Sequence, residues 1–197
     1  VAALDANTTG NYNVALGSYA LSSNTTASNN VAVGDNALYD CTTGANNVAV
    51  GMNALGDHTT TNDNVAVGYF AMRYNTTGAQ NTAVGKGALQ TNSTASYNTA
   101  IGDQALVDNT TGSENVAVGH AALFENTTSS NNTALGVSAL RNNTTGADLT
   151  AVGREALKNN TTGDYNVAVG KNALPNNTTA SKNKALLTTS LNQKTKG

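Results

Sequence analysis

The chain has 197 residues, of which only 11% are charged, and its formal net charge at neutral pH is -2. There is no basic patch for a phosphate backbone, so we expect no nucleic-acid partner. No apolar run is long enough to insert into a membrane, and the single cysteine, Cys41, has no intrachain partner for a disulfide.

A 17-residue unit repeats along almost the whole chain. Counted from Asn64, it reads Asn-Val-Ala-Val-Gly-x-x-Ala-x-x-x-x-Thr-Thr-x-x-x, and most copies add Leu at the ninth place and Asn at the twelfth. A fixed period of this kind predicts a solenoid, in which each repeat forms one coil stacked on the last. The glycine of the fifth place recurs at Gly17, Gly34, Gly51, Gly68, Gly85, Gly102, Gly119, Gly136, Gly153 and Gly170, where we expect each to close a tight turn.

Each unit begins with a strand signal and ends with a turn signal. Segments such as 65–67 are short and β-branched, a second apolar pair such as Ala105 and Leu106 follows the glycine, and the Asn-Thr-Thr stretch is rich in turn formers. The sequence therefore predicts an all-β parallel β-solenoid, or β-roll, of about eleven coils with two short strands in each. We expect residues 1–182 to form the solenoid. Residues 183–197, where Leu187 replaces the glycine, are predicted to be a C-terminal cap or junction.

Stacking places identical residues above one another. Two asparagine ladders are expected, one from the first place and one from the twelfth, with side-chain amides bonding between coils. Cys41 and His58 interrupt the twelfth-place ladder and Leu149 interrupts the other, so local defects are predicted there. The twelfth-place ladder comprises Asn7, Asn24, Asn75, Asn92, Asn109, Asn126, Asn143, Asn160 and Asn177.

The third place is alanine in every copy, which calls for an explanation. Strand side chains alternate between faces, so the valines of the second and fourth places must point opposite to this alanine. We expect the valines to face inward and the alanines to face another chain closely, in a homo-oligomer that is a trimer or a filament. The alanine column comprises Ala15, Ala32, Ala49, Ala66, Ala83, Ala100, Ala117, Ala134, Ala151 and Ala168.

Side chains that could carry chemistry are scattered. His58 and His120 lack partners at metal-ligand spacing, and no regular aspartate column is present, so neither a metal nor a cofactor is expected. Asp40 and Asp57 share a column in neighbouring coils, which is the basis for a two-carboxylate glycosidase hypothesis. The twelfth-place asparagines match the N-glycosylation pattern, and the adjacent threonines allow an ice-binding hypothesis. We expect a non-enzymatic protein.

Residues 47–51 and 98–102, Asn-Val-Ala-Val-Gly and Asn-Thr-Ala-Ile-Gly, resemble the repeat of YadA-like heads in trimeric bacterial adhesins. The longer unit is also similar to repeat shafts in phage tail fibres. This resemblance implies left-handed β-rolls, three side by side, that lie outside the cell or on a virion. It predicts a structural fibre or adhesion module, with a surface glycan or host receptor as a possible partner. The alternatives are an ice-binding solenoid and a glycan- or receptor-binding tail fibre.

Overall fold

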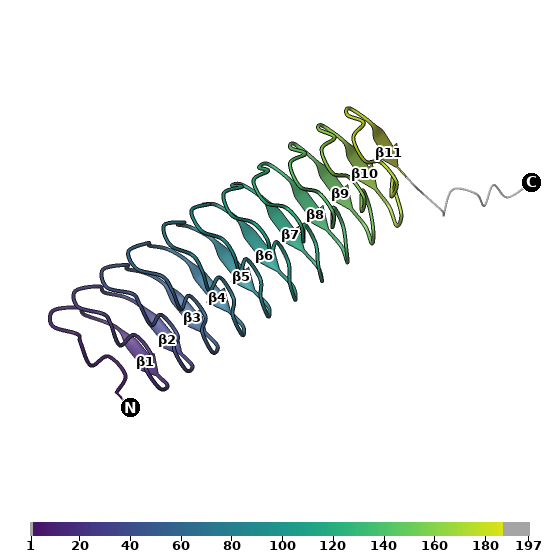
Figure 1. Ribbon diagram of the computed structural model, residues 1–197. Coiled ribbons are helices and arrows are strands. Elements are labelled where there is room, and N and C mark those ends of the chain that lie inside the picture. Colours follow the sequence, from purple (N-terminus) through teal and green to yellow (C-terminus); the bar gives the residue numbers. More distant parts are fainter. Residues whose placement is uncertain (1, 187–197) are drawn as a thin grey trace, which may run out of the picture.

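The computed structural model describes residues 2–186, which form one stack of similar coils with β1 and β11 at opposite ends (Figure 1). Every coil contributes one three-residue strand to a single parallel sheet, whose strand order follows the sequence. The described residues include no helix that is long and apolar enough to cross a membrane. The strands are β1 (Val14–Leu16), β2 (Val31–Val33), β3 (Val48–Val50), β4 (Val65–Val67), β5 (Thr82–Val84), β6 (Thr99–Ile101), β7 (Val116–Val118), β8 (Thr133–Leu135), β9 (Thr150–Val152), β10 (Val167–Val169) and β11 (Lys184–Leu186).

Neighbouring strands of the sheet are paired so that equivalent positions of successive repeats lie side by side. Each strand residue pairs with the residue 17 positions later, as Ala66 does with Ala83. The predicted all-β parallel solenoid is thereby confirmed. Ala168 pairs with Ala185 in the same way, so β11 extends the stack past the boundary expected at residue 182. The remainder of the expected cap, 187–197, lies outside the described residues.

The side of the coil opposite the sheet differs from the sequence prediction, because the eighth and ninth places form turns and not a second strand. The ninth-place residue has a left-handed backbone in every described coil, as at Leu106 with φ 54°. Coils are still hydrogen-bonded on this side, since the Leu106 N–H donates to the carbonyl of Ala122 at 2.9 Å. A left-handed residue costs roughly 1 kcal/mol, which full burial of the leucine offsets.

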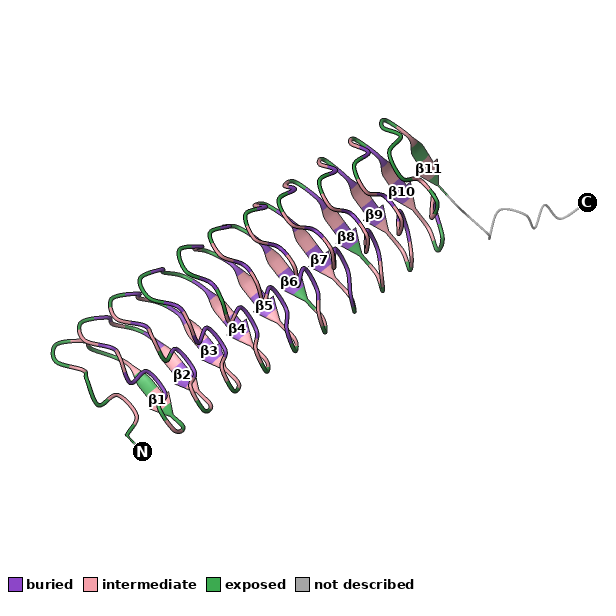
Figure 2. Ribbon diagram, in the orientation of Figure 1, coloured by how far each residue is buried: buried purple, intermediate pink, exposed green. Residues whose placement is uncertain are grey.

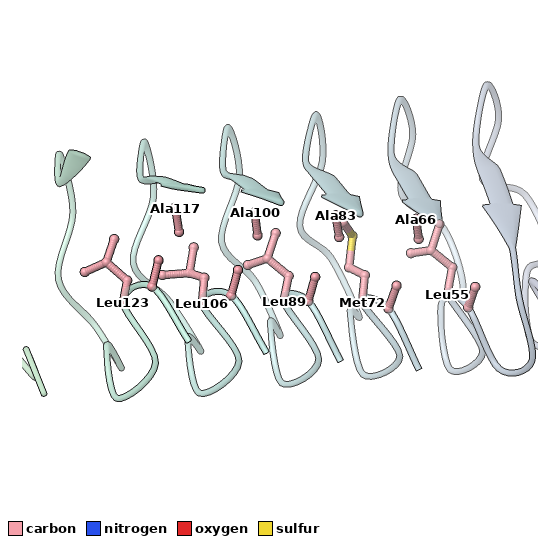
Figure 3. Close-up of a cluster of buried hydrophobic side chains, with 14 of the residues drawn as sticks. Leu55, Ala66, Met72, Ala83, Leu89, Ala100, Leu106, Ala117 and Leu123 are labelled. Carbon is pink, nitrogen blue, oxygen red and sulfur yellow. The ribbon is translucent and has the colours of Figure 1, made fainter. Parts of the chain in front are cut away.

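The orientation expected for the strands was wrong. The alanines of the third place point into the coil and are fully buried from β2 to β10, whereas the valines of the second and fourth places point outward. Figure 3 shows Ala66, Ala83 and Ala100 facing the ninth-place residues of the opposite side, including Met72 and Leu89. The interior is one thin layer, so the strand can supply only a methyl group where the other side supplies a leucine. The alanine column is therefore a packing requirement within one chain.

The fifth-place glycines lie where one coil passes closest to the next. All ten have φ between 124° and 138°, a region that L-residues rarely adopt. A Cβ on Gly102 would lie 2.6 Å from the carbonyl oxygen of Gly119. Any side chain at this place would therefore force adjacent coils apart.

Candidate functional site

The sheet presents a regular apolar surface on its outer side, which we call the valine face. It consists of the residues at the second and fourth places of the repeat, which are the first and third residues of each strand. The fourth place is apolar in all eleven strands, and the second is Val or Thr in all but β11, where it is Lys184. These residues are only partly buried, while the alanine between them is fully buried (Figure 2). A contiguous apolar surface of this length is unusual on a monomeric protein and is typical of an interaction site.

The twelfth-place ladder runs inside the coil, between the Asn-Thr-Thr turn and the core. The Asn109 side chain shows its geometry, since Nδ2 donates to Asn92 Oδ1 at 3.0 Å and to the Gly112 carbonyl at 2.9 Å. Asn109 Oδ1 in turn accepts from Asn126 at 3.0 Å. Each amide thus closes its own turn and links two coils. Because these groups are fully buried, each depends on its neighbour for a partner.

Cys41 and His58 interrupt this ladder without changing the strand register. Cys41 Sγ donates to the Gly44 carbonyl at 3.3 Å, which replaces only the bond inside the turn. Asn24 Oδ1 is consequently left buried without a hydrogen-bond partner. His58 Nδ1 lies 2.6 Å from Thr61 Oγ1, and Nε2 lies 3.3 Å from Asn47 Nδ2. The predicted defects here are therefore gaps in hydrogen bonding and not breaks in the stack.

Burial controls the protonation of both interrupting side chains. It lowers the pKa of His58 to about 4, a shift that a hydrogen bond with the Thr61 backbone only partly opposes. Burial also raises the pKa of the Cys41 thiol to about 11, although the bond to Gly44 acts in the other direction. At neutral pH the ladder therefore contains an uncharged imidazole and an uncharged thiol.

The first-place ladder links coils through backbone N–H groups. The Asn98 N–H donates to Asn81 Oδ1 at 2.9 Å, and Asn98 Nδ2 donates to the Gly112 carbonyl at 2.9 Å. The Leu149 N–H still donates to Asn132 Oδ1 at 3.0 Å, but the leucine side chain offers no acceptor to Asn166 in the following coil. The predicted defect at Leu149 is thus the loss of one inter-coil bond, with β9 and β10 still in register.

The threonines of the thirteenth place and the asparagines of the glycosylation pattern stabilise the Asn-Thr-Thr turn. Hydroxyls of the thirteenth place donate to the backbone of the next coil, as Thr110 Oγ1 does to Thr127 O at 2.9 Å. The fourteenth-place residues, such as Thr111, are exposed to solvent. The sequon asparagines from Asn75 to Asn160 are fully buried, so a glycan on any of them is incompatible with the folded coil.

The acidic columns do not build an enclosed site. Burial, and next the charge of Asp57, raises the pKa of Asp40, while burial and Glu125 do the same for Asp108. Asp57 also lies 3.8 Å from Arg73 Nε. No pocket forms within the part of the chain that the structure describes, and no three potential metal ligands gather there. The carboxylates of the glycosidase hypothesis therefore lie on an open surface.

One group of side chains was not recognised from the sequence. Tyr69, Phe70, Arg73 and Tyr74 come together on the side of the coil opposite the sheet, although all four occupy columns that vary freely. Aligning the repeats one above another would have revealed that aromatic residues gather in three of four consecutive coils, with Met52 in the remaining one. The valine face was missed for another reason, since it was assigned to the interior.

Comparison with protein-family models, with curated proteins and with solved structures found no match to this chain. The likeness to adhesin heads and tail-fibre shafts therefore remains an expectation that the Asn-Val-Ala-Val-Gly segments carry. The function must be argued from the surfaces of the coil.

Proposed function

We propose that this chain is a structural fibre module, without catalytic activity, that associates with copies of itself through the valine face. The observation that carries the proposal is the unbroken apolar fourth-place column on the outer side of all eleven strands. The outward columns of the sixth, seventh, tenth and eleventh places accept charged, polar and aromatic residues alike, so a solvated surface alone does not explain why the fourth place stays apolar. Burial of the valine face against other copies removes apolar area from water, at roughly 25 cal/mol per Å².

The repeat also suits parallel association. Each chain carries a ridge of side chains at every strand, spaced by about 4.8 Å, so identical chains can interlock along their whole length. Three chains around one axis would cover all three valine faces and leave the opposite sides exposed. This is the trimer that the resemblance implies. We propose that it is displayed outside the cell, on a cell surface or a virion, and that it mediates adhesion.

Light scattering with a multi-angle detector tests the association. The chain has a mass of 19.9 kDa, so a trimer would show three times that value, about 60 kDa. Val84→Lys puts a charge in the middle of the valine face, and we expect it to return the mass to that of a single chain. Thr111→Lys, on an exposed turn, is the matched control and should leave the assembly intact. A monomeric mass for the unaltered chain at micromolar concentration would refute the proposal.

A further inference from the structure

We infer that the side of the coil opposite the sheet carries a binding surface for a neutral glycan chain, centred on Tyr69, Phe70 and Tyr74. The inference takes its setting, a displayed fibre, from the proposed function, but it does not depend on self-association. The surface, which we call the aromatic strip, lies between the turn glycine and the asparagine ladder in four consecutive coils. It comprises Tyr19, Tyr39, Met52, Tyr69, Phe70, Arg73 and Tyr74.

The rings of the strip are held in place before any ligand binds. Tyr69 stacks on Phe70 with ring centroids 4.0 Å apart and an interplanar angle of 25°. The Arg73 guanidinium lies 4.6 Å from the centre of the Phe70 ring and 4.9 Å from that of Tyr74, which ties the two rings together. Tyr69 and Tyr74 are nevertheless about two-fifths exposed, at 43% and 40%. Exposed rings that are already immobilised lose little conformational entropy on binding.

The neighbouring coils extend the strip and leave its centre uncovered. Met52 precedes Tyr69 in the same column, while Tyr19 and Tyr39 form an edge-to-face pair nearer the N-terminal end, with centroids 6.1 Å apart. Glycine replaces a side chain beside the centre at Gly87, one coil after Phe70, and at Gly56, one coil before Arg73. At the strand spacing of about 4.8 Å, four coils give a straight strip roughly 15 Å long.

The chemistry of the strip favours sugars. The carbon-bound hydrogens on one face of a pyranose ring carry partial positive charge, and they stack on the electron-rich face of an aromatic ring. Tyrosine hydroxyls at the edge can bond to sugar hydroxyls. Arg73 lies near the Asp57 carboxylate. Lys86, which follows Tyr69 in its column, is itself followed by Asp103. The charges around the strip are therefore of both signs and do not select an anionic glycan.

The shape of the strip also decides the class of ligand. Small molecules bind in concave pockets, and no pocket forms among residues 2–186. A stable interface with a folded protein buries about 800 Å² of surface on each partner. The strip is only as wide as one side of the coil and does not supply that area. A linear sugar chain lying along the fibre axis needs neither a pocket nor a broad face.

The repeat supplies an internal comparison. The same columns in the two coils that follow the strip hold residues such as Lys86, Asp103 and Gln104. Further along, Phe124 and the exposed Val137 occupy these columns in separate coils, without a second ring beside them. Tyr97 and Tyr165 are exposed aromatics too, at 58% and 54%, but they occupy the seventeenth place, several coils apart from each other. They are therefore matched controls, since they share the side chain of Tyr69 without its stacked neighbours.

Titration of the whole chain with neutral hexasaccharides tests the inference, using cello-, chito-, malto- and mannohexaose as probes. The chain has no tryptophan, so tyrosine fluorescence or the aromatic NMR signals of tyrosine report binding directly. We expect at least one probe to bind at millimolar concentration or better. Tyr69→Ala should weaken binding about tenfold or more, while Tyr69→Phe, which keeps the ring, should change it less than about threefold.

The controls separate this inference from the proposed function. Tyr97→Ala should bind the probe as the unaltered chain does, and light scattering should give Tyr69→Ala an unchanged mass, because the strip and the valine face lie on opposite sides. Failure of every probe to bind would overturn the inference, as would binding that Tyr69→Ala leaves intact or that Tyr97→Ala abolishes equally. Capture of a folded protein partner through Tyr69 without any glycan binding would also overturn it.

Discussion

Two stretches of the same asparagine ladder behave differently. From Asn75 to Asn160 each buried amide links its turn to both neighbouring coils, as at Asn109. Across Cys41 and His58 the turns still close, but the Cys41 thiol makes no bond to either neighbouring coil and Asn24 Oδ1 has no partner. Asn75 reaches the His58 coil only through Thr61 Oγ1, at 3.4 Å. The strands remain in register through both stretches. The ladder therefore contributes stability coil by coil, while the backbone hydrogen bonds and the core set the fold.

The largest effect should come from breaking the regular stretch. Asn109→Ala would leave two buried groups without a partner, Asn92 Oδ1 and one N–H of the Asn126 amide. The Gly112 carbonyl would still accept from Asn98. Because each buried polar group that lacks a hydrogen-bond partner costs about 1–3 kcal/mol, we expect a loss of about 4 kcal/mol in the free energy of unfolding. Urea denaturation followed by circular dichroism, at one fixed protein concentration, measures it. Thr111→Ala, on the exposed side of the same turn, should change the midpoint little.

Acid should weaken the interrupted stretch. The pKa of His58 is about 4 in the folded chain, against an ordinary value of 6.5. Between these values the unfolded chain binds a proton that the folded chain does not, so stability is greatest above pH 6.5 and falls as the pH approaches 4. The loss at pH 4 should be at most about 3 kcal/mol.

Denaturation curves measured across this pH range test the role of His58. Carboxylates also titrate in this range, but their contribution to the pH dependence is the same in every variant and cancels in the comparison. His58→Asn should make the decline between pH 6.5 and 4 shallower, whereas His120→Asn, at an exposed place, should retain it. Asn109→His should steepen the decline by moving an imidazole into the regular ladder. Identical pH profiles for the unaltered chain and His58→Asn would show that the imidazole is not buried as described.

Repairing the ladder should have the smallest effect. Cys41→Asn supplies an amide that can donate to Asn24 Oδ1 and to the Gly44 carbonyl, where the thiol now makes one bond. One recovered hydrogen bond is worth about 1 kcal/mol, so the melting temperature should rise by a few degrees. Calorimetry measures the shift, with Cys41→Ser as the control that restores no link to Asn24. A lower melting temperature for Cys41→Asn would contradict the assigned ladder geometry.

Much of this fold follows from the period of the sequence. The uninterrupted spacing of glycines such as Gly102 predicts parallel coils in register, and the asparagine columns predict ladders inside them. The direction of the strands' side chains could not be settled in this way. Alternation shows that Val65 and Val67 share one face and Ala66 the other, but not which face is inward. The thin interior decides it, and its thickness depends on the left-handed leucines opposite, which no local signal in the sequence predicts.

The two candidate surfaces also differ in how much of each could be predicted from the sequence. The valine face was visible in the sequence as a uniform column but was assigned to the core, because apolar residues are usually buried. The aromatic strip was not recognised from the sequence because its members are far apart in the chain and occupy different columns. Tyr39 and Tyr74, for example, are separated by 35 residues. Only the stacking of coils brings them to one side of the molecule.

The central claim, that the outward valines contact other copies of the chain, can be tested by thiol labelling of the assembled protein. Val84→Cys places a thiol on the valine face, and Thr111→Cys places one on an exposed turn. Cys41 serves as a silent background, because it is buried and its thiol pKa is about 11. The account predicts that the thiol at position 84 reacts about tenfold or more slowly than that at 111 while the assembly is intact. Equal rates would contradict it.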